Sequence, residues 1–584
     1  FRFALPLSEL QRFRQWGSLT PGHPEFPLTP GVETTTGPLG QGFANGVGIA
    51  LSSKLLAEEY SPDIFNYRVF GIVSDGDLME GISGEAASLA GHLALSNLIY
   101  IYDDNEISIG GDTDVCFTED VPKRFDGYNW YVQSVDGHDI PAVRECLKRA
   151  LAQNSKPSLI CAHTKIGYGS PNKCGDAEVH GAPLGDEELK LTKQNLSWPL
   201  DKPFLIPDEI AEFCKAQVEE KLKGYEEWQG RYQAWRASNA DKAKGLDRQL
   251  AREIPPPLKE ALLTTFKDIK KEATRSLSGK AIQVIAKHCP YFIGGSADLE
   301  PSTKTLIKDS KEIQPGQMLG RNIRFGVREH AMGALANGLA YSRCWVPFTA
   351  TFLVFSDYMR PTIRLAAISH LQTLFIFTHD SFWVGEDGPT HQPIEHTASL
   401  RLIPNLYVFR PADGMEVAMC YHAALRRQDG PSAMLFTRQD LPTLERAAGF
   451  SADTISQGAY LLSERPNAAA TLVATGSEVW VAAEAAKILE PQGINVRVVS
   501  MPCVELFMAQ DKGYRDSVLK PGMRNISLEA GVTTGWEALL GPGSLKIGID
   551  HFGASAPGGV LAEKFGFTPA AVAEKIGGWI RNKS

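Results

Sequence analysis

Two apolar strands separated by one helix, with acidic and amide side chains where each strand ends, constrain the fold of this chain most strongly. Residues 70–73 (FGIV) form the first predicted strand, which breaks into residues 74–81 (SDGDLMEG). A helix of small residues follows, and the second predicted strand ends in residues 103–107 (DDNEI). Asp75 and Asn105 therefore lie where buried parallel strands run out, and open α/β sheets bind their ligands at that edge.

The oxygen-bearing groups at these two strand ends suit a hard cation. A carboxylate, an amide oxygen and a nearby backbone carbonyl form an all-oxygen set of the kind that Mg²⁺ takes, with waters or phosphate oxygens as further ligands. Gly76 beside Asp75 lets the backbone approach a phosphate closely. Asp-Gly and Asp-Asn pairs also mark ordinary turns. Either strand end alone therefore indicates a turn rather than a metal site.

Composition places the chain among ordinary globular proteins of several domains. Its 584 residues, with 43% hydrophobic and 22% charged side chains, suggest about three or four domains. The net charge of -9 argues against nucleic acid or an anionic membrane as the main partner. No run of about 18 apolar residues predicts a membrane span. Nine cysteines without a Cys-x-x-Cys pair argue against a zinc site or a disulfide framework, so we expect a reducing, cytoplasmic compartment.

Short apolar strands alternating with helices recur in three series along the chain. After the first series the pattern turns charged and helical over residues 186–262, and three consecutive prolines at 255–257 mark a boundary near its end. Such alternation predicts mostly parallel sheets with helices on both faces, and hence an α/β chain of three consecutive domains. The expected domains are residues 1–250 with a helical linker to about 265, residues 266–445, and residues 455–584.

Several motifs, in order along the chain, resemble those of the transketolase family. They are residues 20–23 (TPGH), 37–42 (GPLGQG), 326–333 (GVREHAMG), 385–393 (GEDGPTHQP) and 410–413 (RPAD). The separation of 30 residues between Asp75 and Asn105 is also similar to the diphosphate and metal signature of thiamine-diphosphate enzymes. The resemblance runs from near residue 7 to the end. It implies a diphosphate domain, a pyrimidine domain and a C-terminal transketolase-type domain.

The resemblance implies thiamine diphosphate as cofactor, held through Mg²⁺ or another divalent ion such as Ca²⁺ or Mn²⁺. The implied metal ligands are Asp75, Asn105 and the carbonyl of Ile107. Glu329 would hydrogen-bond the pyrimidine ring and favour the imino tautomer that generates the ylid, and burial would favour its protonated form; a salt bridge to Arg328 is the alternative. The remaining implied cofactor-binding residues are Gly37, Leu39, Gly76, Glu80, His180, Asp298, Phe352, Phe355 and Tyr358.

Three of those residues are aromatic. Phe352, Phe355 and Tyr358 are spaced i, i+3 and i+6, so we expect them to share one face of a helix. An aromatic stripe at this spacing is usually plain core. The resemblance instead implies that the rings cradle the pyrimidine.

The resemblance also implies a sugar-phosphate substrate. The implied catalytic residues are Glu329, His391 and His23. The two histidines would stabilise charge that develops on the donor, and Asp387 would bind a substrate hydroxyl. The other implied substrate-binding residues are His180, Arg275, Ser302, His379 and Arg438, among which the arginine forks suit a phosphate.

The implied reaction moves a two-carbon ketol unit from a ketose phosphate to an aldose phosphate through an enamine, as in the pentose phosphate pathway or Calvin-type sugar rearrangements. The implied assembly is a homodimer with its active sites at the interface. Residues 455–584 carry no candidate catalytic cluster, so we interpret this region as structural or dimer-supporting.

The chain departs from the family in two places. It begins at Phe1, after the segment in which the family has its first strand and two active-site histidines. Either the sequence is a fragment or the protein has lost groups that assist proton transfer, and for the chain as written we expect weak cofactor binding and slow turnover. Phe382 and Trp383 stand where the family has a small and an aliphatic residue. Two bulky rings beside the substrate channel are expected to narrow the choice of acceptor or to fill space left by that segment.

Three other functions were weighed. Dihydroxyacetone synthase, which uses formaldehyde as acceptor, and a non-catalytic paralogue acting as a scaffold are the alternatives. A nicotinamide dehydrogenase is disfavoured because no Gly-x-Gly-x-x-Gly follows a strand and opens a helix.

Overall fold

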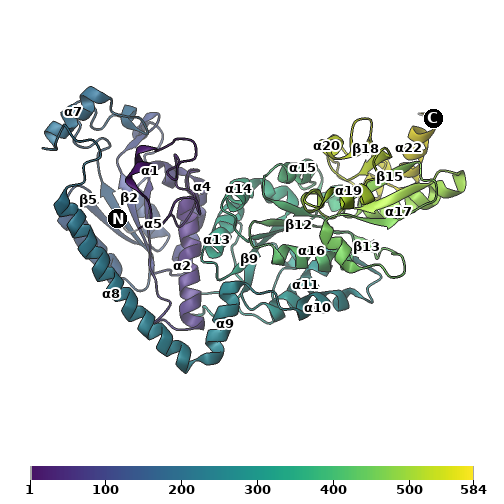
Figure 1. Cartoon of the computed structure of the whole chain (residues 1–584), viewed down its shortest axis with the longest axis horizontal. Coiled ribbons are helices and arrows are strands. Elements are labelled where there is room, and N and C mark those ends of the chain that lie inside the picture. The colour runs from purple at the N-terminus through teal and green to yellow at the C-terminus, as the bar shows by residue number, and fades with distance from the viewer. Residues whose placement is uncertain (1–2, 583–584) are drawn as a thin grey trace. The chain divides into compact units, whose positions relative to one another are not determined.

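The computed structural model describes residues 3–582. These residues divide into two compact units (Figure 1). The first unit ends at Arg248 and also includes Ile313–Leu319, and the second holds the rest of the chain from Gln249 onward. We describe each unit by itself.

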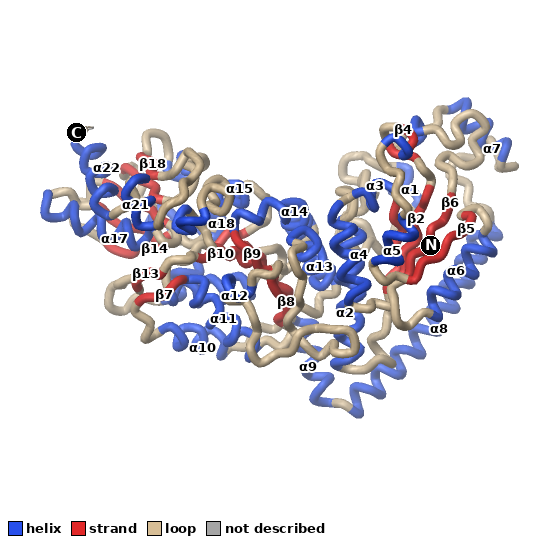
Figure 2. Tube along the Cα trace, turned by 180° about the vertical axis from the view of Figure 1, so that it is seen from behind, coloured by secondary structure: helices blue, strands red, loops and turns tan. Residues whose placement is uncertain are grey.

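The first unit is built on a four-stranded parallel sheet in the order β1-β2-β6-β5. Its strands are β1 (Val69–Ser74), β2 (Leu98–Asp104), β5 (Tyr131–Asp136) and β6 (Ser158–His163). Figure 2 shows α2 (Gln41–Glu59) and α4 (Gly81–His92) on one side of this sheet and α6 (Ile140–Ala152) on the other. Helices on both faces explain why the inner strands are apolar runs rather than alternating ones.

Successive side chains of β2 point to opposite faces of the sheet. Ile99 packs with Cys146 of α6, whereas Tyr100 stacks on Phe43 of α2 at 4.6 Å. Tyr102, two residues after Tyr100, lies on the same face as Tyr100. This alternation directs its hydroxyl toward the end of β1.

Shorter elements and a long helix complete the first unit. They are α1 (Leu7–Gln11), α3 (Asp75–Met79), β3 (Ile107–Ser108), β4 (Gly111–Asp112), η1 (Thr113–Val115), α5 (Val121–Gly127), η2 (Ala177–Val179), α7 (Asp186–Asn195), α8 (Asp208–Ser238) and α9 (Ala240–Ala251), the last of which ends in the second unit. The long helix α8 has no fully buried residue, and its Trp228 indole donates to the carbonyl of Ile64 at 3.0 Å. The predicted charged, helical stretch is therefore helical, as expected.

The second unit contains two five-stranded sheets. The first is parallel, in the order β11-β12-β10-β9-β8. Its strands are β8 (Phe292–Ser296), β9 (Val346–Phe352), β10 (Leu374–Thr378), β11 (Tyr407–Phe409) and β12 (Ser432–Phe436). Every residue of β8, β9, β10 and β12 is buried, as expected for a parallel sheet covered on both faces.

Helices α13 and α14 pack together on one side of this sheet, and α10, α11 and α16 pack together on the other (Figures 1 and 2). The helical elements around it are α10 (Pro257–Phe266), α11 (Thr274–His288), α12 (Glu300–Thr303), α13 (Glu329–Tyr341), η3 (Leu353–Met359), α14 (Arg360–Ile368), η4 (Phe382–Asp387), α15 (His396–Arg401) and α16 (Gly414–Arg426). A short antiparallel pair, β7 (Lys271–Ala273) with β13 (Asp440–Pro442), joins the start of this region to its end.

The last sheet has the order β14-β16-β15-β17-β18 and is mixed, because β14 is antiparallel to β16. Its strands are β14 (Tyr460–Ser463), β15 (Ala470–Ala474), β16 (Val496–Ser500), β17 (Arg524–Leu528) and β18 (Leu545–Ile547). The helical elements here are η5 (Ala452–Gln457), α17 (Glu478–Leu489), η6 (Glu490–Gln492), α18 (Val504–Met508), α19 (Lys512–Val518), α20 (Trp536–Leu540), α21 (Gly558–Phe565) and α22 (Pro569–Arg581).

The predicted α/β class with three domains is confirmed. The predicted boundaries at 250, 265, 445 and 455 stay predictions. Within residues 3–582 no helix combines the length and the apolar character needed to cross a membrane.

Candidate active site

Asp75 opens α3 at the carboxyl end of β1, and only 2% of its surface is exposed. The tyrosine hydroxyl of Tyr102 donates to its Oδ1, whereas its Oδ2 has no hydrogen-bond partner among the described residues. Burial raises the pKa of Asp75, and the hydrogen bond from Tyr102 opposes that rise. A buried carboxylate oxygen is costly to leave unpaired, so Oδ2 has the character of a ligand atom for a cation.

Asn105 lies at the same edge of the sheet, because β1 and β2 run parallel with Ser74 opposite Asp103. The amide oxygen Oδ1 of Asn105 accepts from the backbone N–H of Ile107 at 3.0 Å. Glu106 between them has φ 58°, a left-handed conformation that is uncommon for a side chain of this kind. The chain therefore turns sharply between the two predicted ligands.

All three predicted metal ligands, Asp75, Asn105 and Ile107, line one pocket of about 860 Å³. The pocket wall is strongly acidic. Its acidic members are Asp75, Asp104, Glu106, Asp112, Asp114, Glu119 and Asp120. An excess of carboxylates in a partly enclosed space favours a cation there.

The glycine-rich turn at residues 37–42 is joined to α3 by Asp77. The backbone N–H of Gly40 donates to Oδ1 of Asp77 at 2.9 Å. Gly40 has φ 75°, and a Cβ there would lie 2.6 Å from a side chain of α4, so this close approach requires glycine. A Cβ on Gly76 would lie 3.0 Å from Cδ1 of Leu39. The two glycine-bearing motifs therefore form one surface.

His23 adjoins the same turn. A Cβ on Gly37 would lie 3.5 Å from Cβ and Cγ of His23, and the His23 side chain is exposed. Glu80, the N-cap of α4, is exposed beside Gly40. His180 follows η2 and is exposed, but it is not among the residues that line the acidic pocket.

Glu329 is the first residue of α13, in the second unit, and is half-buried. Burial raises the pKa of its carboxyl, although a backbone hydrogen bond opposes the rise. The guanidinium of Arg328 donates to the carbonyl of Phe325 at 2.9 Å. Glu329 therefore has the electrostatic setting of an acid that is protonated above the ordinary carboxyl range.

Phe352, Phe355 and Tyr358 form a stacked ladder with 6.0 Å between successive ring centroids. The expectation that the three residues share one face of an α-helix is wrong. Phe352 ends β9, and the other two rings lie on the 3₁₀ helix η3. A 3₁₀ helix has three residues per turn, so positions i and i+3 eclipse one another. The ladder runs from the buried Phe352 to Tyr358, which is 60% exposed.

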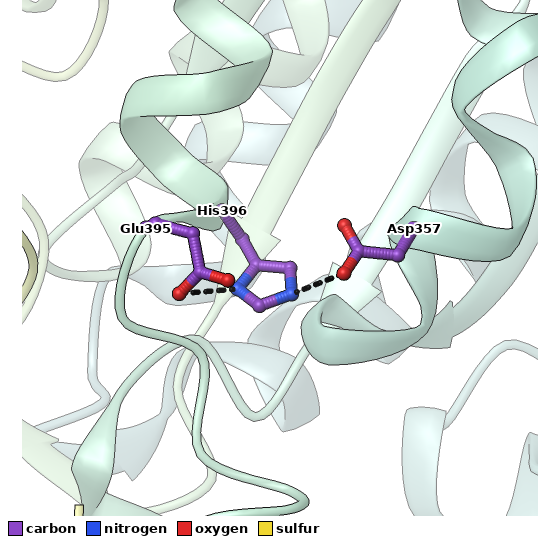
Figure 3. A group of neighbouring side chains, drawn as sticks. All are labelled: Asp357, Glu395 and His396. Carbon is purple, nitrogen blue, oxygen red and sulfur yellow. Dashed lines mark hydrogen bonds and ion pairs between the residues drawn. The ribbon is translucent and has the colours of Figure 1, made fainter. Parts of the chain in front are cut away.

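A histidine between two carboxylates ties this ladder to α15 (Figure 3). His396 is buried, its Nε2 lies 3.2 Å from Oδ2 of Asp357 on η3, and its Nδ1 lies 3.7 Å from Oε2 of Glu395. The three side chains offer ligand atoms within 4.8 Å of one another. Because the two ring nitrogens face different carboxylates, we interpret His396 as a hydrogen-bonded link between η3 and α15 rather than as a metal ligand.

Two predicted substrate histidines, His379 and His391, contact the Phe352 and Phe355 rings of the ladder. The ring of His391 meets Phe355 edge-on at 5.5 Å, and the ring of His379 lies 3.8 Å from that of Phe352. Asp387 ends η4 and is exposed. Two predicted substrate residues, His391 and His379, therefore lie next to the aromatic residues predicted for the cofactor.

The predicted phosphate residues also lie together in the second unit. Pairing of β7 with β13 sets Ala273 opposite Asp440, which brings Arg275 and Arg438 to the same end of that pair. Nη1 of Arg275 donates to the carbonyl of Ser302 at 3.1 Å and lies 3.3 Å from Nε2 of His379.

Two arginines supply the positive charge of this cluster. Nε of Arg275 is buried and has no hydrogen-bond partner in the described part of the chain. Burial, together with the charges of Arg275 and Arg438, lowers the pKa of His379 to about 3. His379 is therefore neutral near neutral pH and contributes a hydrogen-bonding ring. Asp298 follows β8 with φ 60° and is exposed.

Phe382 and Trp383 pack against the domain of the last sheet, and their expected effect on acceptor choice stays a prediction. Phe382 is fully buried and meets the rings of Phe565 and Phe567 edge-on at 5.5 and 5.4 Å, within the core of the last sheet's domain. A Cβ on Gly558 would lie 2.9 Å from the indole of Trp383. The two rings therefore anchor η4 to α21.

Three contributors escaped the sequence analysis. Tyr102 reaches Asp75 from the neighbouring strand, Asp77 joins two motifs, and His396 pairs with Asp357. The signal for Asp77 was its position three residues after Ser74, a helix-start pattern. Nothing in the sequence pairs His396 with Asp357, because that contact depends on tertiary packing.

Comparison with known proteins gives the same result along the whole chain. Residues 1–255 match the family described as "Transketolase, thiamine diphosphate binding domain", residues 270–443 match "Transketolase, pyrimidine binding domain", and residues 458–568 match "Transketolase-like TK C-terminal domain". The transketolase of Geobacillus stearothermophilus is 47% identical over 574 residues, covering 97% of this chain and 86% of the relative. That of Bacillus subtilis is 44% identical over 582 residues, covering 98% and 87%.

Solved structures agree with these sequence matches. The crystal structure of a Pichia stipitis transketolase in complex with sedoheptulose 7-phosphate has a TM-score of 0.95 and 40% identity, covering 99% of this chain and 86% of that one. The transketolase of Leishmania mexicana has a TM-score of 0.94 at 39% identity, with the same coverage.

Proposed function

The chain belongs to the transketolase family and has that family's activity, transfer of a two-carbon ketol unit between sugar phosphates; from this premise we propose which residues carry each part of the reaction. The chain contains the family's thiamine-diphosphate-binding domains. Thiamine diphosphate, when bound, supplies the carbon nucleophile. The residues described above bind, orient and exchange protons around it.

Asp75, Asn105 and the carbonyl of Ile107 would hold a divalent ion. The observation that carries this proposal is the buried Oδ2 of Asp75, which has no hydrogen-bond partner among the residues that the structure describes. Mg²⁺ is preferred because the donor set is all oxygen, and Ca²⁺ or Mn²⁺ fit the same set. Gly37, Leu39, Gly76 and Glu80 would surround the diphosphate, and His180 would join them. The fit is supported by the close approach of the two glycine-bearing motifs.

In the second unit, the protonated carboxyl of Glu329 would donate a hydrogen bond to the pyrimidine of the cofactor. The raised pKa supports this role, because an ionised carboxylate could only accept. The stacked rings of Phe352, Phe355 and Tyr358 would pack against the pyrimidine ring. Asp298, which follows β8, is the other cofactor-binding residue proposed in this unit. The His396–Asp357 hydrogen bond keeps η3 in place.

The substrate phosphate binds Arg275, Arg438, Ser302 and neutral His379. Nε of Arg275, which has no hydrogen-bond partner within residues 3–582, supports this assignment, since a phosphate oxygen would satisfy it. His391 and His23 stabilise charge on the donor oxygen atoms, and Asp387 accepts from a substrate hydroxyl. The Pichia stipitis transketolase in complex with sedoheptulose 7-phosphate shows that a related enzyme binds such a sugar phosphate.

We propose a homodimer in which each site combines the first unit of one subunit with the second unit of its partner. Co-expression of differently tagged Asp75→Asn and Glu329→Gln chains tests this arrangement. Each variant alone should be inactive. Mixed dimers carry one site with both substitutions and one site with neither, so random pairing should restore about a quarter of the unsubstituted activity. Complete inactivity of the purified mixed dimer would contradict the proposal.

The nine cysteines are all free, which supports a reducing compartment such as the cytoplasm.

A further inference from the structure

We propose that the C-terminal domain positions the substrate loop, and that Gln392 is the positioning residue through which it acts. The substrate loop is residues 381–394, which carry Asp387 and His391. The inference rests on the roles proposed above for those two residues. It gives the last domain a part in substrate selection.

The loop is anchored at its beginning by aromatic packing. Phe382 is fully buried between Phe565 and Phe567, and its ring also stacks on Trp383 at 5.2 Å. The indole of Trp383 lies against the first residue of α21, Gly558. The start of the loop is therefore part of the hydrophobic core of the last domain.

Two glycines let the middle of the loop follow the surface of that domain. Gly385 has φ 84°, and a Cβ there would lie 3.5 Å from the carbonyl of Ala556. Gly388 has φ 77°, and a Cβ there would overlap Oγ of Ser555. Gly385 lies two residues before Asp387, and Gly388 directly follows it. Its backbone is thus held between two points of the last domain.

Gln392 makes the polar connection. Its side chain is buried at 2% exposure, and Nε2 donates to the carbonyl of Gly385 at 2.8 Å and to that of Ala554 at 2.9 Å. One amide group therefore joins the loop to itself and to the last domain. A Cβ on Gly553 would overlap Oε1 of Gln392, so the chain of the last domain passes directly over this amide.

The end of the loop is fixed in the same way. The backbone N–H of Val532 donates to the carbonyl of Ile394 at 3.1 Å. Between these anchors, the backbone N–H of His391 donates to the carbonyl of Gly388 at 3.0 Å. On the loop, Phe382, Gln392 and Ile394 are buried, whereas Asp387 is exposed and His391 is half-buried. Contact with the last domain therefore leaves the two substrate residues directed away from the core.

The test compares three single variants in the full-length enzyme loaded with cofactor. Gln392→Met removes the bridge while keeping the length of the side chain. Gly553→Ala reaches the same bridge from the last domain, because its Cβ displaces the Gln392 amide. Gln372→Met is the matched control: Gln372 is equally buried at 1% exposure and donates to the carbonyl of Leu425 at 2.6 Å, away from the loop.

The readout is the ratio of kcat/KM for an aldehyde acceptor bearing a 2-hydroxyl to that for the same aldehyde without it, with the thermal midpoint and the cofactor Kd measured alongside. We expect Gln392→Met and Gly553→Ala to lower this ratio about tenfold, mainly through KM for the hydroxylated acceptor. Gln372→Met should leave the ratio unchanged, whatever it does to the thermal midpoint. A ratio that is unchanged in both loop variants, or lowered equally in the control, would overturn the inference.

Asp387→Ala separates this inference from the function on which it rests. If Asp387→Ala leaves the ratio unchanged, the proposed role of Asp387 fails. If Asp387→Ala lowers the ratio but Gln392→Met and Gly553→Ala do not, the role of Asp387 stands and the positioning by the last domain is wrong.

Discussion

Replacing Arg275 by methionine should separate recognition of the phosphate from the rest of catalysis. Its guanidinium is held by the carbonyl of Ser302 and the ring of His379, and its Nε lacks a partner within the described structure. Hydrogen bonds to charged groups contribute about 1.5–3 kcal/mol. Since about 1.4 kcal/mol corresponds to a factor of ten, KM for a ketose phosphate should rise about ten- to hundredfold.

Arg438 provides a comparison at the same site. It is exposed, so solvent screens its charge, and Arg438→Met should raise the same KM only about two- to fivefold. Steady-state kinetics with a ketose phosphate and the corresponding free ketose measures both effects. KM for the free ketose and the cofactor Kd should change little in either variant. An equal loss for both ketoses, or a larger effect from Arg438→Met, would refute the phosphate assignment.

Three further predictions concern other parts of the molecule. The apoprotein with Glu329→Gln should gain thermal stability at about pH 8 and less at about pH 5. A carboxyl whose pKa is raised in the folded state destabilises the fold increasingly as pH rises above its ordinary pKa, and fully once pH exceeds the raised pKa. An equal gain at both pH values would contradict this. Asp75→Asn should raise the Mg²⁺ concentration needed for half-maximal cofactor binding about a hundredfold or more, as measured by calorimetric titration. An unchanged Mg²⁺ concentration would show that Asp75 is not a metal ligand. Phe382→Ala should cost about 3–5 kcal/mol of unfolding free energy, whereas Phe552→Ala, at a side chain that is 76% exposed, should be nearly neutral; similar losses in denaturant titrations would show that Phe382 is not core.

The local sequence was enough to predict most of the architecture. Apolar runs of strand length, interrupted by helical patterns, gave an α/β chain, and the structure has three such sheets. The pairing of Asp75 with Asn105 was also predictable, because parallel neighbouring strands must place their carboxyl ends at one edge. The unexpected antiparallel strand is β14, whose direction is set by its partner and not by its own composition.

The sequence by itself determined which elements form and which side chains stand at their ends, because periodicity and turn residues act within a few positions. Only the tertiary structure decided which distant elements meet. The β7–β13 pair brings Arg275 to Arg438, and Phe382 packs into a domain that begins far beyond it in the chain. Such contacts arise from the burial of whole surfaces, and no short stretch of sequence records the partner against which its surface will be buried.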